Sequence, residues 1–269
     1  MESGFLGVRF RPVLFEGYRT GAVDIGLADR RIISVPSQLG CRVACTFCIS
    51  SATRLVRNLS ADEMLQLVRT CLDGAPPDDR PIELSFTGEG EPALNWRAAA
   101  QVCSALPDIS ANFDCVRYSF SGLGAASLLG KLDGGGYPTR LQFSLHAARD
   151  SVRSALVPRT APLADILEAM RRHQSQFSGV ELNVVLQDGV NDSDEDLDAL
   201  ISWGDAAWPI LLNPLLSDGT EKMAARTEHF REKLFAAGRV VRQYRKIAAQ
   251  ISREGVYPLM TARATKAAY

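Results

Sequence analysis

Residues 41–48 read Cys41-Arg42-Val43-Ala44-Cys45-Thr46-Phe47-Cys48, a run that holds three of the six cysteines of this 269-residue chain. A short apolar strand candidate, residues 32–35, leads into it. Outside a secreted protein, clustered cysteines indicate metal or redox chemistry rather than a disulfide framework. We therefore expect a fold that presents a loop of three thiols just after a strand.

Strand-like and helical segments alternate along the rest of the chain. A capping box, Ser60 with Glu63 three residues on, predicts a helix start. The strand candidates are residues 32–35, 82–86, 116–120, 141–145, 180–186 and 209–212. The helix candidates are residues 64–72, 98–106, 163–173, 197–203 (capped by Ser193) and 230–237. This alternation predicts parallel βαβ units of an α/β fold, wound into an open sheet or a full or partial barrel.

Composition limits the class of protein. Hydrophobic residues make up 46% of the chain and the formal net charge is -1, which is ordinary for a globular protein and excludes a wholly basic nucleic-acid binder. The sequence lacks both an apolar run of membrane-helix length and a signal-peptide layout, so we expect a cytoplasmic location and no membrane partner. We expect one domain over residues 1–269, with 1–30 as an N-terminal extension and about 222–269 as a basic C-terminal helical segment.

That C-terminal segment is the one local concentration of positive charge. Residues 222–253 carry nine Lys or Arg against two Asp or Glu. Such a stretch is either a phosphate-binding face or, more commonly, a solvated helical face. The first interpretation keeps a nucleotide or RNA substrate open.

Polar and glycine residues gather where the predicted strands end. They are Gly90, Glu91, Ser119, Ser144, His146 and Asn213. In parallel α/β folds the carboxyl ends of the strands carry the chemistry, so these residues should face a common pocket. Taken singly, each is also compatible with a local structural role, as a turn residue, a strand residue that bonds locally or a core histidine.

Three thiolates in one loop suit an iron–sulfur cluster with one iron left open. A structural zinc site needs four ligands. Cys71 and Cys103 fall in predicted helices and should pack as small hydrophobes, whereas Cys115 directly precedes a predicted strand. An iron–sulfur cluster is therefore favoured over zinc and over a chance grouping of core cysteines.

The cysteine spacing, with Phe47 just before the last cysteine, resembles the cluster motif of the radical S-adenosylmethionine (radical SAM) superfamily. Further segments, in the same order from about residue 30 to about residue 245, resemble the rRNA adenine methyltransferases of that superfamily. They are Arg57-Asn58-Leu59-Ser60, Gly88-Glu89-Gly90-Glu91-Pro92, Ser144-Leu145-His146-Ala147, Leu156-Val157-Pro158, Val190-Asn191-Asp192 and Leu212-Asn213-Pro214.

This resemblance implies a partial (β/α)6 parallel barrel of radical SAM type. It implies that Cys41, Cys45 and Cys48 hold a [4Fe–4S] cluster whose unique iron binds SAM, and that SAM is cleaved to a 5′-deoxyadenosyl radical. An electron donor such as flavodoxin or ferredoxin would be a partner.

The resemblance also implies the residues that bind SAM. Gly90 and Glu91 match residues that meet its amino group, and Asn213 matches one at its methionyl end. Residues along the ribose and carboxylate are matched by Ser119, Ser144 and His146. Phe47, beside the last cysteine, is grouped with them.

Two departures from these methyltransferases shape the expected function. Only about thirty residues precede the matched region, so we expect no N-terminal RNA-handling domain. Their C-terminal methyl-accepting cysteine has no counterpart, because residues 247–251 read Ile-Ala-Ala-Gln-Ile and no cysteine follows Cys115.

The expected reaction is therefore hydrogen abstraction from a small molecule, with nucleosides and nucleotides included, leading to rearrangement, cyclisation or oxidation. The first alternative is a methyltransferase acting on RNA or on a small molecule, although RNA is the less favoured partner. An alternative of another class is a non-catalytic protein that binds SAM or the cluster.

Overall fold

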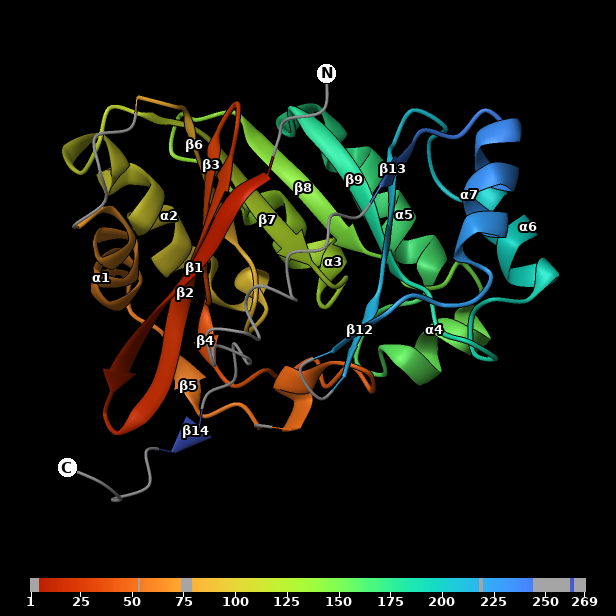
Figure 1. Ribbon diagram of the computed structural model, residues 1–269, viewed down its shortest axis with the longest axis horizontal. Coiled ribbons are helices and arrows are strands. Elements are labelled where there is room, and N and C mark those ends of the chain that lie inside the picture. The colour runs from red at the N-terminus through yellow and green to blue at the C-terminus, as the bar shows by residue number, and fades with distance from the viewer. Residues whose placement is uncertain (1–4, 53, 74–78, 218–219, 244–261, 264–269) are drawn as a thin grey trace.

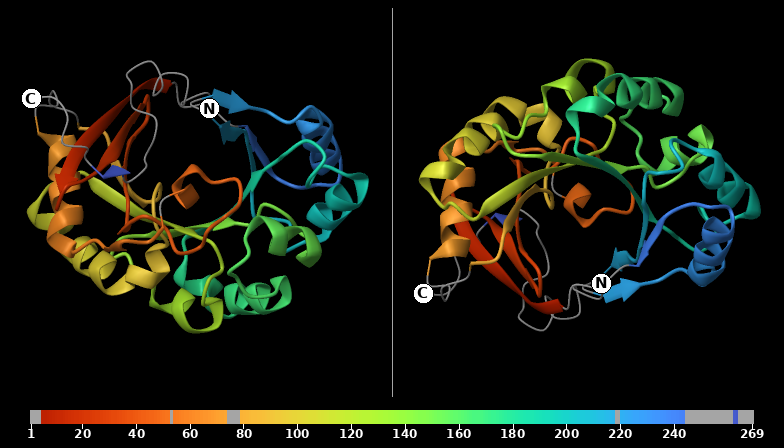
Figure 2. Two further views of the ribbon diagram at one scale, coloured as in Figure 1. Left: turned by 90° about the horizontal axis from the view of Figure 1, so that it is seen from below. Right: turned by 90° about the horizontal axis from the view of Figure 1, so that it is seen from above.

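The computed structural model describes residues 5–52, 54–73, 79–217, 220–243 and 262–263. Its centre is a curved ten-stranded sheet with helices on its convex side (Figure 1; Figure 2). None of the described helices is long and apolar enough to cross a membrane.

The main sheet combines an antiparallel edge with a parallel body. Its order is β1-β2-β3-β6-β7-β8-β9-β10-β13, with β14 paired to β2. Pairing is parallel from β3 to β13 and antiparallel among β1, β2 and β3. The bounds are β1 Phe5–Phe15, β2 Tyr18–Leu27, β3 Arg31–Val35, β6 Ile82–Phe86, β7 Phe113–Phe120, β8 Thr139–Ser144, β9 Gly179–Val185, β10 Ile210–Asn213, β13 Val241–Gln243 and β14 Ala262–Arg263. Two small antiparallel pairs lie apart from it, β4 Gln38–Leu39 with β5 Arg57–Asn58, and β11 Leu215–Ser217 with β12 Thr220–Lys222.

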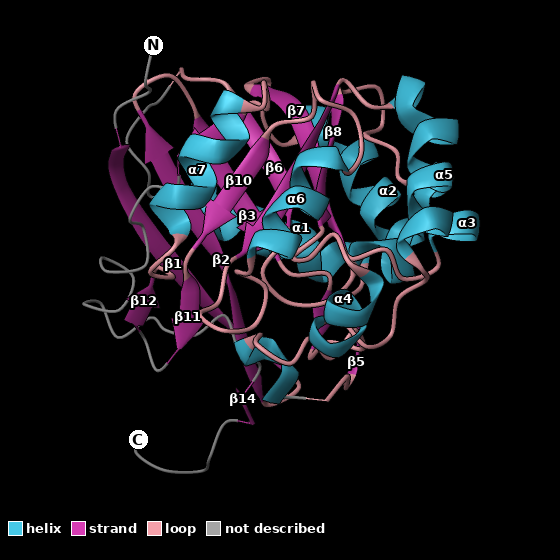
Figure 3. Ribbon diagram, turned by 90° about the vertical axis from the view of Figure 1, so that its right-hand side faces the viewer, coloured by secondary structure: helices cyan, strands magenta, loops and turns pink. Residues whose placement is uncertain are grey.

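A helix follows each parallel strand from β3 to β10 before the chain returns to the sheet. The helices are α1 Ala61–Leu72, α2 Trp96–Ala105, α3 Ala125–Leu128, α4 Asp150–Leu156, α5 Leu163–His173, α6 Asp194–Ser202 and α7 Thr227–Ala236. Figure 3 shows α4, α6 and α7 on the outer side of the strands. In the described residues β1 and β13 are the unpaired ends of the sheet, so the predicted partial (β/α)6 barrel is confirmed, with β13 as a further parallel strand.

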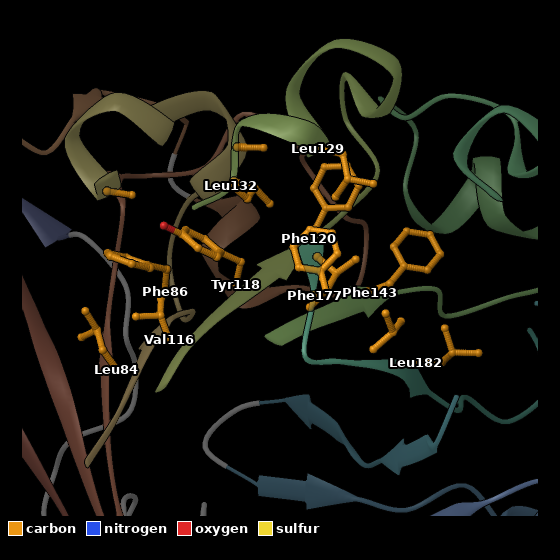
Figure 4. Close-up of a cluster of buried hydrophobic side chains, with 14 of the residues drawn as sticks. Leu84, Phe86, Val116, Tyr118, Phe120, Leu129, Leu132, Phe143, Phe177 and Leu182 are labelled. Atoms are coloured by element: carbon orange, nitrogen blue, oxygen red, sulfur yellow. The ribbon is translucent and has the colours of Figure 1, made fainter. Parts of the chain in front are cut away.

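The outer face of the sheet packs against the helices through large apolar side chains. Along β7, Val116, Tyr118 and Phe120 are buried on this face, as are Leu84 and Phe86 of β6 (Figure 4). Their rings and branches meet those of neighbouring elements, with the rings of Phe86 and Tyr118 stacked at 4.9 Å between centroids. This core holds the strands in register and turns the alternate residues to the inner face.

The inner face is polar, and near the amino ends of the strands it carries ion pairs. Glu83 of β6, only 1% exposed, lies 2.6 Å from Arg117 of β7 and 3.1 Å from Arg140 of β8. Glu181 of β9 accepts from Gln142 at 2.8 Å. A buried carboxylate needs such partners because desolvation alone would penalise its charge.

The segment expected as an N-terminal extension adds two strands to the sheet. Residues 5–27 form β1 and β2, and β2 is tied to α1 through a buried ion pair. Asp24 accepts from Arg31 at 2.7 and 2.8 Å, and Arg31 also donates to the carbonyl oxygen of Cys71 in α1 at 2.5 Å. Within the expected C-terminal segment the structure describes Lys222 of β12, α7 and β13, while residues 244–261 and 264–269, including 247–251, lie outside the described residues.

Several predicted elements match the structure closely. The helix over 163–173 and the strand over 82–86 have the predicted bounds, and both predicted capping boxes or caps, at Ser60 and Ser193, are present. One prediction needs correction. Because β7 begins at Phe113, Cys115 lies inside the strand rather than before it.

We predict that Asp24→Ala lowers the free energy of unfolding by about 3–5 kcal/mol, because it leaves the buried Arg31 guanidinium without its carboxylate. Glu16→Ala is the control, since it removes the exposed partner of Arg57 and should cost less than about 1 kcal/mol. Urea denaturation of both variants measures the difference. Equal losses would contradict a role for Asp24 in clamping β2 to α1.

Candidate functional site

The cysteine loop follows β3 and lies between the paired strands β4 and β5. Gly40 starts the loop with φ +74, and a Cβ there would lie 2.2 Å from the carbonyl oxygen of Arg54. Cys41 and Arg54 form a parallel bridge at the same point. Glycine is therefore required for the tight approach that opens the loop.

The far side of the loop is fixed to α4. The N–H of Thr46 donates to the carbonyl oxygen of Leu156 at 2.9 Å, and the hydroxyl of Ser51 donates to the carbonyl oxygen of Cys45 at 2.5 Å. A small apolar cluster backs the loop, formed by Val43, Ala147, Leu156 and Val157 with Cys41, Cys45 and Phe47 against it. The structure thus holds the three cysteines on a supported loop rather than on a free one.

The three thiols lie close enough to influence one another. Burial raises the pKa of Cys41 to about 11, and the neighbouring Cys48 adds to the rise. Burial likewise raises the pKa of Cys45 to about 12, followed by the effects of Cys48 and Cys41. Backbone N–H groups of Val43 and Ala44 bond to Cys41 and work in the opposite direction. The loop therefore favours the neutral thiols of Cys41 and Cys45 until a metal displaces their protons.

Ala44 has φ +59, a left-handed conformation that is uncommon for a residue with a side chain. Its N–H and that of Val43 both point to the Cys41 sulfur. Successive N–H groups of this kind form an anion-binding concavity. The left-handed backbone at Ala44 thus accompanies two N–H groups that lower the pKa of Cys41 against the larger effect of burial.

In the described residues no group of three or more His, Cys, Asp or Glu side chains converges as the ligands of a single metal ion do. An iron–sulfur cluster makes a different demand, because each thiolate binds a separate iron atom. Three half-buried thiols spaced along one loop suit that donor set.

Glu91, predicted at the end of β6, is buried beside the cysteines. Its Oε2 accepts from the N–H of Ser121 at 2.8 Å and its Oε1 from the N–H of Ala93 at 3.1 Å. Burial raises its pKa to about 7 against the lowering effect of those bonds. Its charge in turn raises the pKa of Cys41 and Cys45, which places the carboxylate within electrostatic range of both thiols.

Gly90 allows Glu91 to approach the segment that precedes the cysteine loop. It has φ +94, and a Cβ would lie 2.7 Å from both Gln38 and Ser37. The N–H of Glu91 donates to the side-chain oxygen of Gln38 at 3.0 Å. No side chain fits at position 90 without moving this contact.

His146 and Phe47, both predicted, are in contact. Their ring centroids lie 4.6 Å apart at 67°. Burial lowers the pKa of His146 to about 3, with a further contribution from Arg153. The N–H of Val185 donates to Nδ1 at 3.2 Å, so the neutral ring carries its hydrogen on Nε2.

Asn213 ends β10 and is linked to a residue that the sequence did not single out. Its side-chain amide donates to Asn183 of β9. The carbonyl oxygen of Asn183 accepts from the N–H groups of Leu145 and His146 at 3.0 and 3.1 Å. Asn213 and His146 are thus brought to the same edge through Asn183. Ser144, half-buried at the end of β8, pairs with Asn183 in the register of β8 and β9.

Ser119 lies on the inner face within β7, one residue before the strand ends at Phe120. Its hydroxyl donates to Gln142 Oε1 at 3.1 Å. Ser121, which the sequence reasoning passed over, contacts Glu91 directly. The pattern offered a signal, because Ser121 is the first polar residue after the predicted strand 116–120.

The sequence analysis also missed three buried side chains that donate hydrogen bonds to backbone carbonyl oxygens. Asn95 donates to Ser37 and Leu59, and Asn191 donates to His146 and Val185. Arg153 of α4 donates to several carbonyls at the ends of β7 and β8. An arginine within the otherwise apolar face of α4 was the available signal for the last.

The cysteines outside the loop are unavailable for chemistry. Cys71 and Cys103 are buried in α1 and α2, as predicted, and Cys115 is buried in β7, where its sulfur lies 3.6 Å from Glu83 Oε2. Burial raises the pKa of each to about 12. A thiol at such a pKa is a poor nucleophile at neutral pH.

The basic C-terminal stretch is largely occupied by its own contacts where it is described. Lys222, Arg226, Arg231 and Arg242 pair with carboxylates, and Arg239 is buried. A different set of cations flanks the cysteine loop. Arg42, Arg54 and Arg159 are exposed, and none forms an ion pair with a carboxylate in the described part of the chain. Arg159 donates to the carbonyl oxygen of Arg42 at 3.0 Å, so two of the three are adjacent.

Comparison with known proteins identifies the family. The profile of the Radical SAM superfamily matches residues 35–201. A probable RNA methyltransferase of Anaeromyxobacter sp. (strain Fw109-5) is 36% identical over 219 residues, which cover 79% of this chain and 64% of the relative. A probable dual-specificity RNA methyltransferase RlmN of Chlorobium phaeobacteroides (strain BS1) is 33% identical, covering 72% of this chain and 56% of the relative. The chain thus spans about half to two thirds of the length of these relatives.

The fold has a solved counterpart. The crystal structure of a radical SAM methyltransferase from Sphaerobacter thermophilus matches with a TM-score of 0.73 and 28% sequence identity, covering 91% of this chain and 79% of that one. The resemblance drawn from the motifs is confirmed by these matches.

We predict a pH-dependent stability of the metal-free protein that originates at Glu91. Its pKa is raised in the folded state, so stability is greatest when the carboxyl is protonated and is lost as the pH rises through about 7. Glu91→Gln should remove this dependence, which reaches about 1.4 kcal/mol per pH unit between pH 5 and 7. Urea denaturation of both proteins across that range is the measurement, and parallel curves would contradict the assignment.

Proposed function

The chain belongs to the radical SAM superfamily of iron–sulfur enzymes that use SAM, and on that premise we propose that it methylates RNA. The choice of RNA as substrate rests on three exposed arginines beside the cysteine loop that form no ion pair with a described carboxylate. They are Arg42, Arg54 and Arg159. The names of the relatives at 33% and 36% identity support the reaction class.

Cys41, Cys45 and Cys48 would hold the [4Fe–4S] cluster and leave one iron open for SAM. The fit rests on three thiols of one loop, on the N–H groups aimed at Cys41 and on the apolar backing of Val43 and Leu156. When reduced, the cluster supplies one electron that cleaves SAM to methionine and a 5′-deoxyadenosyl radical.

Glu91 would bind the ammonium group of SAM. Its carboxylate bonds to the N–H of Ala93 and to the N–H and hydroxyl of Ser121, and it forms no ion pair within the described residues, so a positive ligand would be its first ion-pair partner. A charge-assisted contact of this kind is strong in a buried setting. The neutral His146, with Phe47 against it, and the amide of Asn213 would orient the remaining polar groups of SAM, with Ser144 and Ser119 further along the inner face.

Three exposed guanidinium groups suit the phosphates of RNA, because Arg donors pair well with phosphate oxygens. They lie on the loop that would carry the cluster and on the segment after α4 that contacts it. RNA bound to them would approach the carboxyl edge of the sheet, where the radical would be formed.

A second candidate is hydrogen abstraction from a small molecule, such as a nucleotide, without methyl transfer. The observation in its favour is the lack of an available methyl-accepting thiol. Cys71, Cys103 and Cys115 are buried with pKa values near 12, and no cysteine follows Cys115 in the sequence. If RNA is methylated, the methyl group should therefore not pass through a cysteine outside the loop.

We predict that anaerobic reconstitution yields about four irons per chain. Replacing Cys41, Cys45 and Cys48 together by alanine should abolish iron binding and the charge-transfer absorbance. Cys115→Ala removes a thiol outside the loop and should leave both intact. Iron retained by the triple variant, or zinc alone in the wild-type protein, would refute the assignment.

With methyl-labelled SAM, dithionite and RNA transcripts, we predict 5′-deoxyadenosine, label in an adenine of the RNA and no methylated Cys71, Cys103 or Cys115 by peptide mass spectrometry. Release of 5′-deoxyadenosine with a nucleotide and no label in RNA would favour the second candidate instead. Label on one of those cysteines that then moves to RNA would overturn the argument from buried thiols.

The proposed contacts between these arginines and RNA can be tested by substitution. The double variant Arg42→Ala, Arg54→Ala should bind RNA more weakly and with a shallower salt dependence, by about 0.7 in logarithmic slope for each lost phosphate contact. Arg172→Ala, on α5 and paired with Glu168, should leave both unchanged. Equal affinities of the double variant and the wild-type protein would remove the support for RNA.

A further inference from the structure

Among the residues that the structure describes, Arg153 is the largest side chain that is fully buried, at 2% exposure. It extends from α4 to the carboxyl edge of the sheet. Its Nε donates to the carbonyl oxygen of Leu145 at 3.0 Å, and its Nη2 donates to those of Ser121 at 2.6 Å and Ser144 at 3.2 Å. Its Nη1 donates to the hydroxyl of Thr160.

These acceptors are all neutral. By contrast Arg31 of β3 and Arg117 of β7 each have a carboxylate within 2.7 Å. Burial lowers the pKa of Arg153 to about 10, so it remains a cation at neutral pH. A buried cation without an anion is unfavourable. The fold therefore keeps a positive charge that its described carboxylates do not neutralise by an ion pair.

The cysteine loop, which carries the proposed cluster ligands, lies beside the helix that holds Arg153. The cysteine loop is bonded to α4 through Thr46 and Leu156, and Cys45 packs on the apolar cluster that includes Leu156. The positive charge of Arg153 lowers the pKa of Cys45, against the larger effect of burial. Arg153 thus lies within electrostatic range of a proposed cluster ligand.

We propose that Arg153 is a positioning residue whose buried charge is the counter-ion of the iron–sulfur cluster and favours its reduced state. The inference rests on the proposed function. A [4Fe–4S] core of charge +2 with three thiolates has a net charge of -1, and one electron from a low-potential flavin or iron–sulfur protein makes it -2. A fixed cation stabilises the second state more than the first.

Arg239 provides a matched control. It is also buried, at 4% exposure, and donates only to carbonyl oxygens, those of Ile201 at 2.9 Å, Trp203 at 2.8 Å, Leu200 and Asp205. It lies between α6 and β13, whereas the cysteine loop follows β3. Replacing it removes the same kind of buried charge and the same kind of hydrogen bonds at a different place.

The test is a redox titration of the reconstituted proteins, followed by electron paramagnetic resonance, without SAM. Arg153→Gln should reduce the equilibrium constant for one-electron reduction at least about tenfold, which lowers the midpoint potential by about 59 mV. Arg153→Lys, which keeps the charge, should lose less than half of that shift. Arg239→Gln should titrate like the wild-type protein, although its melting temperature falls.

Equal potentials for Arg153→Gln and the wild-type protein would overturn the proposal while leaving the proposed function intact. Failure of the wild-type protein to assemble any cluster would instead refute the proposed function. If Arg153→Gln does not fold, Arg153→Met takes its place. Should neither neutral variant assemble a cluster while Arg153→Lys and Arg239→Gln do, the charge is required and the proposal is supported. Loss of the cluster in Arg153→Lys as well would make Arg153 a donor to carbonyls alone, against the proposal.

Discussion

Buried carbonyl groups at the carboxyl edge of the parallel sheet impose the constraint on which the site depends. Loops cover this edge, so its carbonyl oxygens cannot turn to water, and each one left unpaired would cost about 1–3 kcal/mol. Side chains supply the donors. Asn95 serves Ser37 and Leu59 before and after the cysteine loop, while Asn191 serves His146 and Val185. The edge is therefore polar for structural reasons as well as chemical ones.

The same donors fix the geometry of the residues proposed to bind SAM. Asn191 holds the carbonyl of His146, whose φ of +58 is otherwise unfavourable, and Val185 holds its ring. Ser121 connects two charges, because its N–H donates to Glu91 and its carbonyl accepts from Arg153. A shift of any one of these groups would disturb the others, since a buried polar network is stable only when every member is satisfied.

Sequence patterns predicted what is determined locally. The amphipathic helix Leu163–His173, whose predicted bounds were right, and the predicted caps at Ser60 and Ser193 arise from neighbours within a few residues. The α4 helix was missed because it has 7 residues and places Arg153 where periodicity expects an apolar side chain. The pairing of Asn183 with Asn213 and the docking of β1 and β2 depend on contacts between distant segments, which one sequence does not reveal.

Parallel strands buried on both faces usually read as continuous apolar runs, whereas β7 alternates because its inner face is polar. On that face the amino ends neutralise themselves, with Glu83 held between Arg117 and Arg140. At the carboxyl edge, by contrast, two buried charges of opposite sign are not paired. Glu91 and Arg153, opposite in charge and both bonded to the backbone of Ser121, are not paired with each other. In the proposed function each finds a partner of opposite charge outside the chain, the ammonium group of SAM for Glu91 and the anionic cluster for Arg153. Two buried, opposite and separated charges at one edge are costly without partners, so the proposal requires that the binding of a cationic ligand and of an anionic cofactor offsets this cost together.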